Sequence, residues 1–145
     1  MNQNKVGIIT GASRGMGAQI AINLASFGIR VALIATSSAR LLKIKKIIVD
    51  NKGSAIVIKA DIYNFTEVKK AFRQIIKEYG RIDFLINNAS VISPIGKISD
   101  TDPYEWKKNI EMNLIGGYNM IRACIDFFFA AKTWSYCKCK FRCCT

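Results

Sequence analysis

Short runs of Val, Ile, Leu and Ala alternate along the chain with longer segments in which apolar residues recur every three or four positions. Short, strongly apolar runs are typical of strands that are buried on both faces of a sheet, and the longer spacing is typical of amphipathic helices. The pattern predicts strands at Val6–Thr10, Arg30–Ala35, Ala55–Ala60 and Ile82–Ile86.

Helices are predicted between these strands and after the last one. The first covers Gly15–Phe27, and its apolar face consists of Met16, Ile20, Leu24 and Phe27. The second has a core-facing stripe of Leu41, Ile44 and Ile48, and it stops near Gly53, because glycine commonly follows the last residue of a helix.

The third and fourth predicted helices carry capping signals. Asn64 followed by Glu67 resembles a capping box, and the helix behind it ends at Gly80. Asp102-Pro103 supplies a cap and a proline at the first helical position of the last helix, which we expect to reach about Phe129.

This alternation of strands and helices predicts the α/β class, with one doubly wound parallel sheet of the Rossmann type and helices on both faces. Ligands of such sheets bind outside the carboxyl ends of the strands, where the strand order reverses. The residues that directly follow the predicted strands are therefore the candidates for a ligand site.

A glycine-rich turn with the spacing G-x3-G-x-G joins the first strand to the first helix. Such a turn places unpaired backbone N–H groups and the positive end of the helix dipole at one point, which attracts phosphate. An ordinary turn of an α/β domain is the alternative interpretation. The candidate phosphate-binding residues are Thr10, Gly11, Ala12, Ser13, Arg14, Gly15, Met16 and Gly17.

Further polar segments follow the other predicted strands. Thr36, Ser37 and Ser38 follow the second strand, Asp61-Ile62 follows the third, and Asn87–Ser90 follows the fourth. Because the carboxyl ends of parallel strands meet at one edge of the sheet, these segments converge on the glycine-rich turn. The convergence predicts a dinucleotide site.

Composition narrows the class of protein. The length of 145 residues is that of one domain, and 50% hydrophobic residues exclude a disordered chain. We expect a cytoplasmic protein without a membrane contact, because no signal peptide is visible and Arg122 and Asp126 interrupt the most apolar stretch. The net charge of +12 is compatible with nucleic acid, but the lysines of the second helix are more simply a solvated face, so we favour an anionic cofactor and expect no nucleic acid.

Together the motifs resemble the short-chain dehydrogenase/reductase family, including its 3-oxoacyl carrier-protein reductases. The resemblance covers about residues 5–130 and rests on Thr10–Gly17, Asp61-Ile62, Asn87-Asn88-Ala89 and Asn113. It implies an NAD(P)-dependent oxidoreductase that interconverts a small carbonyl compound and an alcohol, and a homo-oligomer for the intact family.

The resemblance also implies roles for the cofactor-binding residues. By it, Gly11–Gly17 holds the pyrophosphate, Asp61 and Ile62 meet the adenine, and Asn88 and Ala89 lie along the adenosine ribose. Ser90 stands where the family usually has glycine, which we expect to shift the loop slightly and to leave the site in place.

Asn113 is the candidate catalytic residue. It matches the helix asparagine that supports a relay of water and lysine in the family. From the residues alone, Asn113 is instead a polar residue at a helix bend beside Gly116-Gly117.

The end of the second strand bears on the choice of cofactor. An NAD site places a carboxylate there for the ribose hydroxyls, but this chain has Ala35-Thr36-Ser37-Ser38 and no acid. Arg14 and Arg40 are candidates for pairing with a 2′-phosphate, although both are alternatively solvated surface residues. We therefore predict NADP in preference to NAD.

The family's chemistry needs a Ser, a Tyr and a Lys four residues after the Tyr, with the Tyr as general acid/base. The two Tyr-x3-Lys matches are Tyr104 with Lys108 and Tyr136 with Lys140, and both are misplaced relative to Asn113. We expect the chain to lack these catalytic residues and to be inactive. The alternative is a non-catalytic NADP-binding or interaction module.

Residues 132–145 form a Cys- and Lys-rich tail behind a partial dinucleotide-binding domain of residues 1–131. Four of the five cysteines lie in the tail: Cys137, Cys139, Cys143 and Cys144. They could bind a soft metal or form disulfides, but they lack the paired C-x2-C spacing of a structural zinc site, and we assign no metal ligand.

A change of reading frame is the third explanation of the tail. Codons that encode Thr133–Cys144 also encode, one base later, His-Gly-Arg-Ile-Val-Asn-Val-Ser-Ser-Val-Ala. That segment looks like the fifth strand and catalytic-serine region of the resembling family. The hypothesis is that one extra base near Lys132 puts the tail out of frame.

An out-of-frame tail predicts a sheet that is truncated after the fourth strand and its following helix. The edge of the fourth strand would then be unpaired. The apolar face of the last helix would lose its cover, at Leu114, Ile115, Ile121, Ile125 and Phe127–Phe129. We expect low solubility, aggregation, or folding only with a partner.

Overall fold

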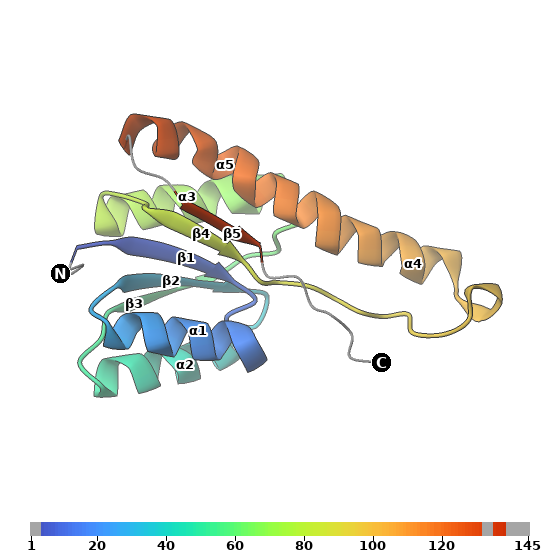
Figure 1. The fold of residues 1–145 in the computed structure, drawn as a ribbon, viewed down its shortest axis with the longest axis horizontal. Helices are drawn as coiled ribbons and strands as arrows, with labels where there is room; N and C mark the ends of the chain where they lie inside the picture. Colours follow the sequence, from blue (N-terminus) through green and yellow to red (C-terminus); the bar gives the residue numbers. More distant parts are fainter. Residues whose placement is uncertain (1–3, 132–134, 139–145) are drawn as a thin grey trace.

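One parallel sheet runs through the computed structural model, which describes residues 4–131 and 135–138 (Figure 1). In sheet order, the strands are β3 (Ala55–Lys59), β2 (Arg30–Ala35), β1 (Val6–Thr10), β4 (Phe84–Asn87) and β5 (Ser135–Lys138). Every neighbouring pair is parallel. The predicted strands are therefore present, with β4 shifted toward its carboxyl end.

Helices cover both faces of the sheet, as predicted (Figure 1). The first face is covered by α1 (Gly15–Ser26) and α2 (Ser38–Asp50), and the other by α3 (Phe65–Tyr79) and α5 (Gly116–Ala131). Before α5 the chain makes a short 3-10 turn, Ile98–Asp100, then α4 (Pro103–Ile110), and then a π-helical segment, Glu111–Ile115. The last three helical segments, from α4 to α5, form one long helix (Figure 1). The doubly wound α/β class is confirmed.

The strands divide the core into two apolar clusters, one for each layer of helices. Ile8 and Ala32 belong to the cluster under α3 and α5, whereas the next residues, Ile9 and Leu33, belong to the cluster under α1 and α2. Successive side chains of a strand point to opposite faces, so strands that are apolar at every position fit a sheet with helices on both sides.

Only part of the apolar face predicted for α1 packs on the sheet, because Ile20 and Leu24 lie partly buried against the core cluster but Met16 and Phe27 do not. The buried residues are Gly17, Ala18, Ala21 and Ala25, whereas Met16 and Phe27 are 50% and 76% exposed. Small side chains bring the helix close to the strands. This close approach places the start of α1 directly beside the carboxyl end of β1.

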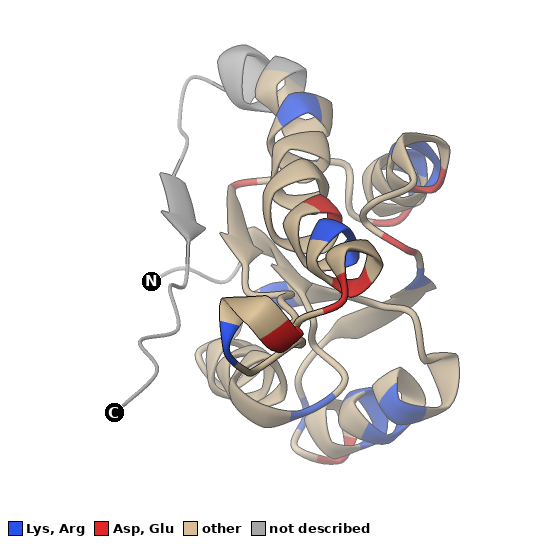
Figure 2. Ribbon diagram, turned by 90° about the vertical axis from the view of Figure 1, so that its right-hand side faces the viewer, with Lys and Arg blue, Asp and Glu red and all other residues tan. Residues whose placement is uncertain are grey.

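The interpretation of α2 as a helix with a solvated basic side is confirmed. Leu41 and Ile48 are buried and Ile44 packs against the same cluster, whereas Arg40 and Lys43 are exposed. Figure 2 shows Lys and Arg spread over several helices rather than gathered at one place.

The expectation of an unpaired edge at β4 is wrong. β5 pairs with β4 in register from Phe84 opposite Ser135 to Asn87 opposite Lys138. A parallel ladder is made by backbone N–H and C=O groups, so a segment can pair without the apolar residues by which strands are recognised in a sequence.

The expectation of an exposed apolar face on the last helix is confirmed for four residues. Exposure ranges from 36% at Ile121 to 58% at Leu114, with Ile115 and Ile125 between these values. Phe127 instead stacks on Phe72 of α3, with 6.1 Å between the ring centroids. The side chains of Phe128 and Phe129 lie outside the described residues. Within the part of the chain that the structure describes, no helix is long and apolar enough to cross a membrane.

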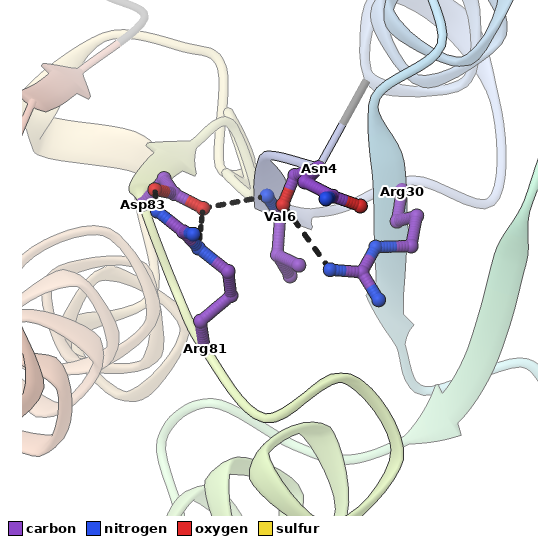
Figure 3. Close-up of polar contacts among 5 residues, drawn as sticks. All are labelled: Asn4, Val6, Arg30, Arg81 and Asp83. Carbon is purple, nitrogen blue, oxygen red and sulfur yellow. Dashed lines mark hydrogen bonds and ion pairs between the residues drawn. The ribbon is translucent and has the colours of Figure 1, made fainter. Parts of the chain in front are cut away.

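A polar cluster closes the amino end of the sheet (Figure 3). Asp83 is buried and accepts hydrogen bonds from the backbone N–H of Val6, at 2.8 Å, and from Arg81. The hydrogen bond and negative charge of Asp83 raise the pKa of Arg81. On the other side of β1, Arg30 donates to the carbonyl of Asn4 at 3.1 Å. These bonds align the starts of β2, β1 and β4, at the end of the sheet opposite the glycine-rich turn.

Candidate functional site

A cavity of about 390 Å³ lies at the point where the strand order reverses. From β1 the chain moves outward to β2 and β3, and it then returns to β4 on the other side of β1. The loops after β1 and β4 therefore leave the sheet toward opposite faces, and a crevice opens between them. Segments that follow β1, β2, β3 and β4 all contribute to its walls.

Most of the residues predicted from the sequence are brought together here. The lining includes Gly11, Ser13, Arg14, Gly15, Met16, Thr36, Asp61, Ile62, Asn88, Ala89 and Ser90.

Four of the predicted cofactor-binding residues do not line the cavity. Thr10 and Ala12 are fully buried beneath it. Gly17 packs against Asn88, and Ser37 is the N-cap residue of α2. These four support the walls rather than form them.

Sequence reasoning missed several lining residues, which are Ile34, Ala35, Ala60, Val91, Ile92 and Met112. Most of them are apolar residues at or just beyond the carboxyl ends of strands, and the same rule that located the polar segments applies to them. Met112 had no such signal, because it reaches the cavity from the π-helical segment.

Two glycines of the glycine-rich turn adopt a backbone conformation that favours glycine. Gly11 and Gly15 have φ of +66° and +57°, in the left-handed region that favours glycine. A Cβ on Gly11 would lie 2.8 Å from the Cα of Ala89, so this turn is closed against the loop after β4. A Cβ on Gly15 would meet nothing within 4 Å, so the backbone there is open to a ligand.

The first turn of α1 leaves its backbone donors free of side-chain caps. Its N-cap residue is Arg14, which makes no cap hydrogen bond, and the turn contains no acidic residue. Gly15 and Met16, the first helical residues, line the cavity. Free N–H groups and the positive end of the helix dipole make this wall attractive to an anion.

A set of buried and partly buried hydrogen bonds ties the turn after β1 to the loop after β4. The hydroxyl of Thr10 accepts from the N–H groups of Asn88 and Ala89, both at 3.0 Å, and donates to the carbonyl of Ile86 at 3.4 Å. The amide Nδ2 of Asn88 donates to the carbonyls of Thr10 and Gly11, at 3.0 and 3.4 Å. Among the described residues, the buried Oδ1 of Asn88 has no partner.

Asn113 does not line the cavity but fixes the loop that does. Its Oδ1 accepts from the N–H of Val91 at 2.9 Å, and its Nδ2 donates to the carbonyl of Val91 at 2.7 Å. Asn109, one turn earlier, accepts from Asn113 at 2.8 Å and donates to the carbonyls of Val91 and Ser93. Asparagines four positions apart share a helix face, and this spacing was the signal for Asn109 that sequence reasoning missed.

The wall after β3 is shaped by the capping box at the start of α3. The side chain of Asn64 accepts from the N–H groups of Thr66 and Glu67, as predicted. Glu67 reaches further back than the usual motif and accepts from the N–H of Asp61 at 2.9 Å. Asp61 in turn accepts from the N–H of Tyr63 at 3.0 Å.

The described lining contains neither tyrosine nor lysine. Tyr104 is exposed at the start of α4 and Lys108 is exposed on the same helix, so this pair lies outside the cavity. Tyr136 is placed in β5, but its side chain and Lys140 lie outside the described residues. No group of His, Cys, Asp and Glu that could hold a metal ion occurs in the described ranges. Cys139, Cys143 and Cys144 and the side chain of Cys137 lie outside the described residues.

Comparison with known proteins gives a consistent result. A family model described as short chain dehydrogenase matches residues 5–134. An uncharacterized oxidoreductase of Listeria monocytogenes is 37% identical over 90% of this chain and 52% of its own length. A CLA biosynthesis dehydrogenase/reductase of Lactiplantibacillus plantarum is 30% identical over 90% of this chain and 46% of its own length. The chain thus spans about half the length of the curated relatives it matches.

Solved structures agree with this result. A metagenomic short-chain oxidoreductase in complex with NADP is 33% identical, with a TM-score of 0.88 over 94% of this chain and 62% of its own. A 3-ketoacyl-ACP reductase from Sinorhizobium meliloti is 26% identical, with a TM-score of 0.88 over 92% of this chain and 52% of its own.

The hydroxyl of Thr10 yields a prediction about stability. Thr10→Val keeps the shape of the side chain but leaves two N–H groups without their acceptor, so we expect the free energy of unfolding to fall by about 2–4 kcal/mol. Thr10→Ser keeps the hydroxyl and should lose about 1 kcal/mol, the contribution of one buried methyl group. Urea unfolding measures both variants. An equal loss in the two would show that the hydroxyl is not the important group.

Proposed function

The chain belongs to the short-chain dehydrogenase family. We propose that it binds a nicotinamide dinucleotide, preferably NADP, in the cavity at the carboxyl ends of β1 and β4. The intact protein would use this cofactor to interconvert a small carbonyl compound and an alcohol. In that reaction the cofactor supplies or accepts a hydride, and the described residues of this chain bind and orient it.

The uncapped start of α1 is the observation that carries the proposal. Its free N–H groups, its acid-free first turn and the open backbone at Gly15 fit a pyrophosphate, whose negative charge would occupy the positive end of the helix dipole. The buried Oδ1 of Asn88 supports the same interpretation, because an acceptor without a partner beside the cavity is suited to a ligand hydroxyl.

The remaining walls suggest how the rest of the cofactor would lie. Asp61 and Ile62 would meet the adenine, and Asn88 and Ala89 would lie along the adenosine ribose. Ser90 would continue this wall toward the nicotinamide, and Asn113 would act from behind it, through the backbone of Val91. The support is that all these residues except Asn113 line one cavity with the glycine-rich turn.

The preference for NADP rests on charge. No acidic residue of the lining follows β2, where Thr36 stands, so a 2′-phosphate would meet no carboxylate there. Arg14 lines the cavity and could pair with that phosphate, whereas Arg40 does not line it. A relative of known structure that is 33% identical was solved with NADP, which supports the same choice.

Binding without turnover is proposed for this chain. A carbonyl reduction needs a general acid beside the substrate oxygen. The described lining offers neither a tyrosine nor a lysine beside Asn88 and Ser90. We therefore propose a site whose described residues would bind the cofactor but do not include the tyrosine and lysine of the reaction.

Residues 132–145 are proposed to be out of frame behind a cofactor-binding domain of residues 1–131. The family match ends at residue 134, close to that boundary, which supports the proposal.

The proposed function predicts saturable NADPH binding by the purified chain and no substrate-dependent oxidation of NADPH. Gly15→Ala should weaken binding at least about tenfold, because its Cβ would occupy the space next to the phosphates. Titration of NADPH fluorescence measures this affinity. Gly80→Ala is the matched control, since Gly80 also has positive φ and open space around it but lies at the end of α3. Turnover by this chain, or equal effects of the two substitutions on binding, would contradict the proposal.

The choice of NADP predicts a selective effect of Arg14→Ala. We expect about tenfold weaker binding of NADPH and unchanged binding of NADH, because only NADPH carries the 2′-phosphate. The control is Arg40→Ala, which should alter neither affinity. If Arg14→Ala weakens both cofactors alike, Arg14 does not select between them.

The origin of the tail is tested by sequencing the gene across Ala131 and Lys132. The expected result is a Tyr-x3-Lys motif in another frame downstream of an extra base. An intact frame with no such motif downstream would show that the tail belongs to the protein as it stands.

A further inference from the structure

The segment Asp61–Asn64 forms the wall of the cavity after β3, and its own hydrogen bonds are local. The backbone N–H of Asp61 donates to the carboxylate of Glu67, and the backbone N–H of Tyr63 donates to the carboxylate of Asp61. Bonds between near neighbours fix the shape of this turn but not its distance from the glycine-rich turn across the cavity. The sheet holds the start of the turn, because the N–H of Ala60 donates to the carbonyl of Ala35 at 3.1 Å. The residues that follow Ala60 need a further attachment from a more remote part of the chain.

Asn119 of α5 supplies such a remote attachment. Its side chain is only 6% exposed, and its Nδ2 donates to the carbonyls of Ile62, at 3.0 Å, and Tyr63, at 2.8 Å. A side-chain amide has two N–H donors, and here two consecutive carbonyls accept from them. A helix that follows β4 thus holds the backbone of the turn that follows β3.

Gly116 lies on the same face of α5, three positions before Asn119, and receives the side chain of Ile62. A Cβ on Gly116 would lie 2.7 Å from Cγ1 and 2.8 Å from Cδ1 of Ile62, closer than real contacts allow. The backbone of Ile62 is therefore held by Asn119, and its side chain fills the space that Gly116 leaves. Met120 and Cys124, both fully buried, anchor α5 itself in the core.

We infer that Asn119 is a positioning residue for the adenine end of the cofactor site. Its amide holds Ile62, and with it Asp61, at the distance from the glycine-rich turn that a dinucleotide requires. Asn119 does not line the cavity and acts only through this turn. The inference rests on the proposed function, in which Asp61 and Ile62 meet the adenine.

The test compares NADPH with its analogue in which hypoxanthine replaces adenine. Adenine carries an amino group that can donate to the carboxylate of Asp61, whereas hypoxanthine carries a carbonyl at the same position. A displaced Asp61 reduces the preference for adenine, while a loss of fold weakens both ligands by one factor. The ratio of the two dissociation constants therefore separates positioning from stability.

Asn119→Leu keeps the size of the side chain and removes both donors. We expect about tenfold weaker NADPH binding and a smaller loss for the hypoxanthine analogue, so that the ratio of the two constants moves toward one. Cys124→Ala is the matched control on α5, because it removes a buried side chain of the same core without touching the turn. It should lower the melting temperature and leave the ratio unchanged.

Gly116→Ala is a second variant that does not depend on how well Asn119→Leu folds. Alanine favours the helix, so α5 should remain formed, but its Cβ displaces the side chain of Ile62. We expect the ratio of the dissociation constants for NADPH and its hypoxanthine analogue to move toward one in this variant as well.

A ratio that stays constant in both variants, while the unchanged chain binds NADPH, would overturn the role of Asn119 and leave the proposed function standing. Failure of the unchanged chain to bind NADPH would instead contradict the proposed function, and this inference would fall with it.

Discussion

The hydrogen bonds between the carboxyl ends of β1 and β4 are the constraint on which the site depends. The two strands are neighbours in the sheet, yet the loops that follow them leave toward opposite faces. The hydroxyl of Thr10 and the amide of Asn88 join these loops across the crevice. Because these bonds are buried or partly buried, water competes little for them, and the open wall at Gly15 keeps a fixed place relative to Ala89.

The long helix from α4 to α5 fixes the backbone of the loops that form the other walls of the cavity. Asn113 and Asn109 hold the backbone of Val91 after β4, and Asn119 holds the backbone of Ile62 after β3. In each case a side-chain amide pairs with backbone groups of a loop, which have no partners within a strand or helix. The turns at the carboxyl edge of the sheet therefore line the cavity, and asparagines of the long helix hold the backbone of these turns in place.

The described walls of the cavity offer hydrogen-bond donors and a positive charge. Its walls offer backbone N–H groups, a guanidinium and amide side chains, all of which suit a negatively charged dinucleotide. Tyrosine and lysine are absent from the described lining. The pairing of β5 with β4 extends the sheet by a further parallel strand.

The sequence by itself determined the strands β1 to β4, the doubly wound class and most of the lining, because apolar periodicity and the glycine spacing are local properties of the chain, but it did not reveal β5. It also located Asn64 as a cap and Leu41 and Ile48 as the buried stripe of α2. Only the tertiary structure decided that α1 packs through Gly17 and its alanines rather than through Met16 and Phe27. It likewise decided the partners of Asn109 and Asn119, because those partners are backbone carbonyls that any sequence carries. The positions of these carbonyls relative to the asparagines depend on packing between elements that are far apart along the chain.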